Sequence, residues 1–206
     1  MSTRRIGVPA ALAAAAVVLL SGCGEESYDY EPVDFGAPGE VTEPGTSLAF
    51  GEPAWLEHTF TGDSGDYTGV QGVSVLDITE GDASMFEEYA NAEEFEGYTP
   101  YLIVTQHQFA DDVPEAPATV DLFPMLADGS DAEWLTSGPI TLAGPGDECG
   151  LNLPDYDEEN HLLLQCFVGL GSNDQVVASA QYFAESYTAM VATEGNEYLE
   201  APVSWE

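Results

Sequence analysis

Residues 101–109, with the sequence YLIVTQHQF, decide the fold class of this chain. Leu102 and Val104 fall on one side of this run, and Tyr101, Ile103 and Phe109 fall on the other. Alternation over a short run rich in apolar and aromatic residues is typical of a β-strand. The sequence therefore predicts a strand at this position.

Similar runs recur from residue 46 onward. Residues 69–78 place Val73 and Val75 on one face, and residues 161–168 place Cys166 on the side expected to face the core. Residues 169–172 (GLGS) predict a hairpin turn. Further strands are predicted at residues 47–50, 55–61, 119–125, 140–143, 175–183 and 203–205. Many short strands separated by Gly, Pro and Asp predict a mainly β fold, a β-sandwich, over residues 46–206.

Residues 82–91 (DASMFEEYAN) break the β pattern. Asp82 or Ser84 is a suitable N-cap, and Met85 and Phe86 fall on the same side as Tyr89. This segment predicts one short helix that covers an end of the sandwich.

The charge balance of the chain excludes two classes of partner. The 206 residues contain 38 Asp and Glu but 2 Lys and Arg, which are Arg4 and Arg5. Binding to nucleic acid needs cationic side chains near phosphates, and adsorption to anionic lipid needs them near the membrane. Neither partner is expected for the rest of the chain.

Residues 1–22 have the pattern of a secretory signal peptide. Arg4 and Arg5 precede an apolar run at residues 8–20 that is too short to span a bilayer. The run ends in LSGC at residues 20–23, which resembles the bacterial lipobox, where the chain is cut before a cysteine that is then acylated. The sequence therefore predicts Cys23 as a lipidation site and a location on the outer face of the cell membrane.

Residues 23–45 predict a linker between this anchor and the domain. The segment is acidic, contains Pro32, Pro38 and Pro44, and lacks helical or strand periodicity. Such a composition is typical of a disordered, flexible tether. If extended, it would hold the domain up to roughly 65–70 Å from the membrane.

Two cysteines, Cys149 and Cys166, remain after Cys23. A pair of cysteines in an exported domain predicts a disulfide bond.

Two acidic loops are weak candidates for calcium binding, because they place carboxylates at alternating positions. The first contains Asp128, Asp131 and Glu133, and neither loop matches the EF-hand pattern. The second contains Asp155, Asp157 and Glu159. No cofactor is predicted apart from this possible calcium.

The sequence contains no motif for a nucleophile, a zinc protease, a phosphate-binding loop or a dinucleotide site. We therefore expect no enzyme activity and no catalytic residue.

Several stretches together resemble a known group of proteins. These are the lipobox, GTSLAFG at 45–51, ITEGD at 78–82, TPYLIV at 99–104 and PVSW at 202–205. The arrangement resembles small actinobacterial lipoproteins of unknown function with an immunoglobulin-like β-sandwich, akin to the mycobacterial immunoprotective extracellular proteins. This resemblance implies the fold and the location and carries no catalytic residues.

The function expected from these observations is that of a lipid-anchored binding or interaction module of the cell envelope. Its partner is an unknown envelope or extracellular molecule. The alternative is a divalent-cation-binding envelope protein that uses the acidic loops.

Overall fold

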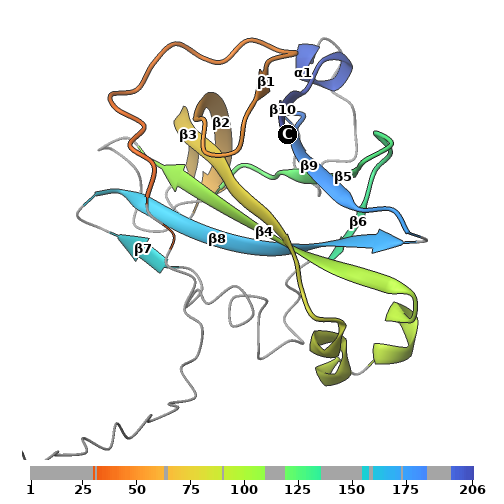
Figure 1. Cartoon of the computed structure of the whole chain (residues 1–206). Helices are drawn as coiled ribbons and strands as arrows, with labels where there is room; N and C mark the ends of the chain where they lie inside the picture. The colour runs from red at the N-terminus through yellow and green to blue at the C-terminus, as the bar shows by residue number, and fades with distance from the viewer. Residues whose placement is uncertain are drawn as a thin grey trace, which may run out of the picture.

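The protein was analysed as a computed structural model that describes residues 30, 32–62, 65–89, 91–109, 119–135, 155–157, 160–172, 174–184 and 196–206. For residues 58–62, 65–67, 88, 155 and 156 it describes the backbone only. The described chain is mainly β and forms two sheets (Figure 1).

The smaller sheet, sheet A, has the strand order β1-β10-β9-β5. Its strands are β1 (Ser47–Leu48), β10 (Val203–Trp205), β9 (Val177–Tyr182) and β5 (Phe123–Leu126). The β1 and β10 strands are parallel, and the other neighbours are antiparallel. The start of the domain is thus paired with its C-terminus.

The larger sheet, sheet B, has the order β2-β3-β4-β8-β6, and β7 also pairs with β8. Its strands are β2 (Ala54–Gly62), β3 (Gly65–Glu80), β4 (Tyr98–Gln108), β8 (Leu162–Ser172), β6 (Glu133–Leu135) and β7 (Asp155–Asp157). All of its pairs are antiparallel. The β4 and β8 strands pair along their whole length, from Tyr98 opposite Ser172 to Gln108 opposite Leu162.

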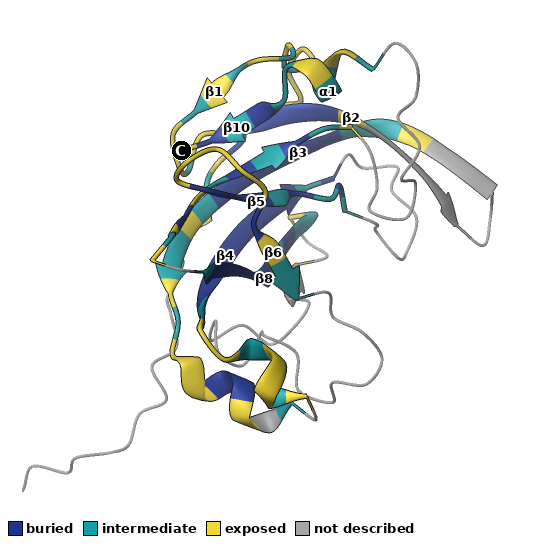
Figure 2. Cartoon of the chain, turned by 90° about the vertical axis from the view of Figure 1, so that its right-hand side faces the viewer, coloured by how far each residue is buried: buried dark blue, intermediate teal, exposed yellow. Residues whose placement is uncertain are grey.

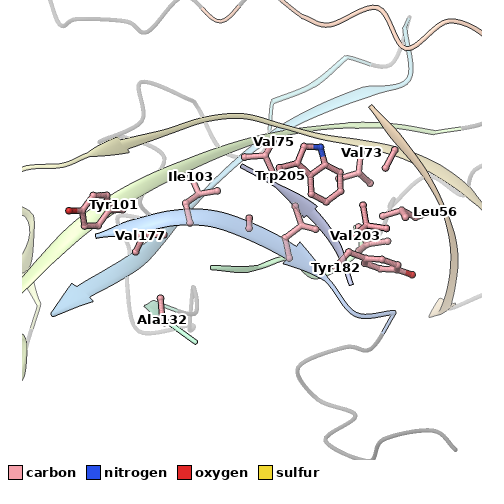
Figure 3. Close-up of a cluster of buried hydrophobic side chains, with 14 of the residues drawn as sticks. Leu56, Val73, Val75, Tyr101, Ile103, Ala132, Val177, Tyr182, Val203 and Trp205 are labelled. Atoms are coloured by element: carbon pink, nitrogen blue, oxygen red, sulfur yellow. The ribbon is translucent and has the colours of Figure 1, made fainter. Parts of the chain in front are cut away.

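The main core lies between the two sheets. Tyr101 and Ile103 of β4 pack in one buried cluster with Tyr182 of β9 and Trp205 of β10. Figure 3 shows side chains of both sheets pointing toward one another in this cluster. The two sheets therefore form two layers around a common core, with Trp205 fully buried at 0% exposure.

A second cluster covers the opposite face of sheet B. Leu102 and Val104 of β4 pack there with Met85 and Phe86. Because residues of β4 alternate between the two clusters, this strand is buried on both faces (Figure 2). The predicted alternation of residues 101–104 is confirmed.

The segment predicted as a helix is a 3-10 helix, η1 (Ala83–Glu88), followed by a second one, η2 (Ala92–Phe95). The Asp82 carboxylate accepts a hydrogen bond of 2.8 Å from the backbone N–H of Ser84, so the predicted cap is confirmed. The rings of Phe86 and Phe95 stack at 4.7 Å between centroids. Aromatic contacts between two short turns replace the longer helix. A short α-helix, α1 (Glu197–Glu200), was not predicted.

Several strand boundaries differ from the prediction. The predicted turn at residues 169–172 lies within β8, because its glycines leave room for neighbouring side chains. A Cβ atom on Gly171 would lie 2.7 Å from Cε2 of Tyr101. Residues 119–122 precede β5 rather than belonging to it, and the strand predicted at 140–143 lies outside the described residues.

Candidate binding site

Tyr30, the first described residue, packs against the second cluster. After it comes a strap, defined here as residues 32–45, that runs over sheet B toward β1 (Figure 1). Its first contact is with Gln106 of β4, whose side chain is fully buried at 0% exposure. The backbone N–H of Val33 donates to Oε1 of Gln106 at 2.8 Å, and Nε2 of Gln106 donates to the carbonyl of Val33 at 2.7 Å. The Gln106 amide therefore pairs with the strap as a neighbouring strand would.

The second contact is an aromatic one. Phe35 is buried, and its ring packs edge to face against Trp55 with centroids 6.1 Å apart. The ring also occupies the space over Gly72 of β3, where an added Cβ would lie 2.5 Å from Cδ2 of Phe35. A glycine at this position leaves the room that the ring needs.

The strap then continues along the edge of the domain. The backbone N–H of Thr42 donates to the carbonyl of Trp55 at 2.7 Å, and the hydroxyl of Tyr198 donates to the carbonyl of Thr42 at 2.7 Å. The N–H of Gly45 donates to the carbonyl of Ala201 at 2.7 Å. Sheet B and the C-terminal segment around α1 thus hold the strap.

These contacts correct the predicted linker at residues 23–45. Residues 32–45 are bound to the domain. The buried ring of Phe35 and the hydrogen-bonded backbone groups offset the conformational entropy that the chain loses when it is ordered. The acidic, proline-containing composition did not indicate these contacts. Residues 23–29 and 31 lie outside the described part.

A cavity of about 360 Å³ opens beside the first residues of the strap. Its walls include Pro32 of the strap, Gln106 of β4, Asp157 of β7, and Leu162 and Leu164 of β8. The volume is within the range of about 300–1,000 Å³ that is common for small-molecule sites. This is the candidate binding site.

The polar groups of the cavity are held in place by neighbours. The Asp157 carboxylate accepts hydrogen bonds from the backbone N–H and the side-chain amide of Asn160, at 3.1 and 2.6 Å. The Gln106 amide is fixed by Val33. A carboxylate beside two leucines and a proline suits a small, partly apolar molecule that is neutral or positively charged.

A buried polar network supports β4 on its other face. His107 is 1% exposed, with its Nε2 3.0 Å from the Thr105 hydroxyl and its Nδ1 3.3 Å from Oε1 of Gln71. Because Oε1 of Gln71 is an acceptor, which also accepts from the backbone N–H of Val120, Nδ1 of His107 donates to it. This network fixes β4 at the point where Gln106 projects toward the strap.

The structure does not bring the three carboxylates of the first acidic loop together, and calcium binding by this loop stays a prediction. Asp128 accepts hydrogen bonds from the backbone N–H and hydroxyl of Ser130 and from the amide of Gln175. Glu133 accepts instead from the hydroxyl of Tyr98 at 3.1 Å, and Asp131 is exposed. No group of three potential metal ligands occurs among the described residues. Asp128 and Glu133 are therefore hydrogen-bonded to different partners.

In the second acidic loop, Asp157 lines the cavity, whereas the side chain of Asp155 and all of Glu159 lie outside the described part. Calcium binding by these three residues stays a prediction.

The cysteines are described in part. Cys166 is buried as predicted, but in the second cluster, with Val104 and Val168, on the face of sheet B opposite the core between the sheets. Cys149 and Cys23 lie outside the described residues. Their roles in a disulfide bond and in lipidation stay predictions.

The signal peptide predicted at residues 1–22 is also outside the described residues. Within the described part, no helix has the length and apolar character needed to cross a bilayer. Comparison of the chain with known protein families, with curated proteins and with solved structures finds no match.

Proposed function

We propose that this chain is a lipid-anchored, extracytoplasmic binding module on the outer face of the cell membrane, with an immunoglobulin-like β-domain and no catalytic activity. The cavity between the strap and β7–β8 is its ligand site. The ligand is a small amphiphile with an apolar part and a neutral or cationic polar group.

The observation that carries this proposal is the construction of the cavity. Its described walls come from the strap, from β4 and from the neighbouring strands β7 and β8, which are three parts of the chain far apart in the sequence. Leu164 also packs against the second cluster, so one wall continues into the core. Such a site is held open by the fold rather than by a single loop.

Charge determines which molecules suit the site. The chain has no Lys or Arg after Arg5, so no such side chain competes for Asp157. The negative field of the domain concentrates cations and repels anions. An organic anion is therefore disfavoured.

The immunoglobulin-like and lipoprotein parts of the proposal have separate support. Two packed sheets, antiparallel in every described pair except β1–β10, around one core resemble the architecture of that fold class. The signal sequence and the lipobox at residues 20–23 support the anchor.

The test uses three probes of equal chain length at fixed ionic strength, namely hexylammonium, hexanol and hexanoate. The protein is the exported Cys23→Ser chain, and the readout is its thermal unfolding midpoint. We expect a saturable rise with hexylammonium, a smaller one with hexanol and none with hexanoate.

Asp157→Asn should reduce the effect of hexylammonium to that of hexanol. Glu96→Gln is the matched control, because it removes the same charge at an exposed residue beyond η2. Equal losses in the two variants would show that net charge alone attracts the amine, and the proposed site would be wrong.

A further inference from the structure

Residues 30–35, which we call the arm, contact sheet B as a bound peptide would. The side-chain amide of Gln106 accepts from the backbone N–H of Val33 at 2.8 Å and donates to the carbonyl of Val33 at 2.7 Å. Because this pair involves only the main chain of Val33, it does not depend on the side chain at that position. In the recognition of extended peptides, main-chain hydrogen bonds give affinity and pockets for side chains give specificity.

The specificity comes from the pocket that receives Phe35. Gly72 forms the floor of this pocket, because an added Cβ there would lie 2.5 Å from Cδ2 and 3.1 Å from Cε2 of the ring. Trp55 forms a wall, with its ring at 84° to that of Phe35. Phe35 is buried, whereas Asp34 is exposed. The face therefore recognises a main chain at one position and an aromatic ring two positions later.

The face that receives the arm belongs to the centre of sheet B. Gln106 of β4 lies opposite Ser74 of β3 and Leu164 of β8. The backbone pairs among these three strands do not involve the arm, so the framework of the face does not depend on it. Tyr30, at the start of the arm, packs against the second cluster. The arm thus contacts the sheet near both of its ends.

The connection that follows the arm is exposed at every residue from 36 to 41. Gly36 has a φ of +66°, and an added Cβ there would have no atom within 4 Å. Phe35 packs on the ring of Trp55, and the N–H of Thr42 donates to the carbonyl of Trp55 at 2.7 Å. The connection is therefore a loop with both ends at one residue. Extension of this loop would move the arm away from its own face while Thr42 stays bound.

A second copy of the chain offers the same arm and the same face. Exchange of an identical segment between two copies is domain swapping, a route to dimers of low free-energy cost. In a reciprocal exchange each face is filled by the arm of the other copy. The contacts of Tyr30, Val33 and Phe35 are then all retained.

We infer that this face of sheet B is a peptide-binding site, and that the arm of a second copy of the chain can replace the chain's own arm on it. In such a pair, Pro32 of each copy lines the cavity of the other. The inference depends neither on the ligand of the cavity nor on the lipid anchor.

Two factors limit this exchange in dilute solution. The chain's own arm is covalently connected, so its effective concentration at the face is roughly millimolar. The chain has no Lys or Arg after Arg5, so two copies repel one another, and added salt screens this repulsion. Exchange should therefore increase with protein concentration and with salt.

The first test offers the face a free peptide with the sequence of residues 30–36 and a dye at its C-terminus. The protein is the exported Cys23→Ser chain at high salt, and the readout is fluorescence anisotropy. Phe35→Ala in the protein weakens its own arm and leaves the face intact. We expect this variant to bind the peptide at least about ten-fold more tightly than the unchanged chain, because its face is free for a larger fraction of the time.

The control protein is Phe50→Ala, because Phe50 is an exposed residue outside the strap. It should bind the peptide no more tightly than the unchanged chain. The control peptide carries alanine in place of Phe35 and should bind at least about ten-fold more weakly than the unchanged peptide, because it cannot fill the pocket over Gly72.

The second test asks whether a second copy is the occupant. Gln106→Met removes both hydrogen bonds from the face and leaves the arm intact, whereas Phe35→Ala impairs the arm and leaves the face intact. An equimolar mixture of the two variants therefore brings an intact arm and an intact face together. We expect several-fold more two-chain complex in the mixture than in either variant alone, as measured by light scattering after gel filtration. Replacement of the Gln106→Met chain by Phe50→Ala should not give this increase.

Thermal unfolding of each variant is measured first. Phe35→Leu and Gly72→Ala replace Phe35→Ala and Gln106→Met if either of these fails to fold. A peptide that binds the arm variant no more tightly than the unchanged chain would overturn the peptide-binding site. Peptide binding without association in the mixture would overturn the second copy as its occupant. Peptide binding together with association supports both parts of the inference.

Discussion

Phe35→Ala tests whether the strap is part of the folded domain. Complete burial of a phenylalanine side chain contributes about 1.5–3 kcal/mol, and Phe35 is only 7% exposed. Its edge-to-face contact with Trp55 adds about 0.5–1.5 kcal/mol. Because the strap can partly close over the vacated space, we expect a loss of about 2–4 kcal/mol in the free energy of unfolding.

The measurement is urea denaturation followed by tryptophan fluorescence, with Phe50→Ala as the control. Phe50 is 36% exposed, so its truncation should cost at most about 1 kcal/mol. Equal losses in the two variants would refute the reasoning, because they would show that Phe35 is no better packed than an exposed ring.

A double-mutant cycle with Gly72→Ala sharpens this test. The added methyl group would lie 2.5 Å from the Phe35 ring and 2.9 Å from Cζ3 of Trp55. Gly72→Ala should therefore destabilise the wild type and cost less in the Phe35→Ala background, with a coupling energy of about 1–2 kcal/mol. Additive costs would mean that the ring does not occupy the space over Gly72.

Three further predictions concern polar groups. Ser74→Ala should leave the free energy of unfolding unchanged or raise it by up to about 1 kcal/mol, because the buried Ser74 hydroxyl has no hydrogen-bond partner among the described residues. Thr105→Val should lower it by about 1–2 kcal/mol, because it breaks the contact with His107. Chemical denaturation of both variants distinguishes the two outcomes. Rising concentrations of NaCl or KCl should raise the thermal midpoint equally, because added salt screens repulsion among 38 acidic residues; a fall with either salt would contradict this. Hydrogen bonds from the hydroxyl and backbone N–H of Ser130 lower the pKa of Asp128 in the folded protein. The ionised Asp128 therefore stabilises the fold fully above about pH 4, the pKa in the unfolded chain, and this contribution is lost as the pH falls through the lower pKa of the folded state. Asp128→Asn should thus destabilise the protein at pH 6 and approach wild-type stability below pH 4, as measured by denaturation at each pH.

Local alternation was sufficient to predict the strands that form the centre of sheet B. Tyr101 and Ile103 on one face of β4, and Leu102 and Val104 on the other, are placed by periodicity alone, because every neighbour on either side is apolar. The short strands β6 and β7 were missed because pairing with β8, rather than their own sequence, determines them. The position of η1 was predicted from its cap, but its helix type depends on the aromatic contacts with η2.

The candidate site could not be predicted in the same way. The linker at residues 23–45 was predicted from its acidic, proline-containing composition. Composition is an average over a segment, so it does not reveal that one side chain, Phe35, packs over Gly72. The partner of Val33 is Gln106, 73 residues away, and no local pattern reports such a pairing. The one phenylalanine of this stretch, flanked by Asp34 and Gly36, was the signal in the sequence.

The order of contacts along the strap also determines how the domain responds to mechanical force. Among the described residues, tension applied from the N-terminal side reaches Tyr30 first, then Val33 and Phe35, then Thr42 and Gly45, and only afterwards the parallel pair β1–β10. Because these contacts bear the load one after another rather than together, we expect each to break at a low force. Release of residues 33–44 adds about 40 Å of chain before either sheet is strained. We therefore expect the strap to detach and lengthen under tension while both sheets stay folded.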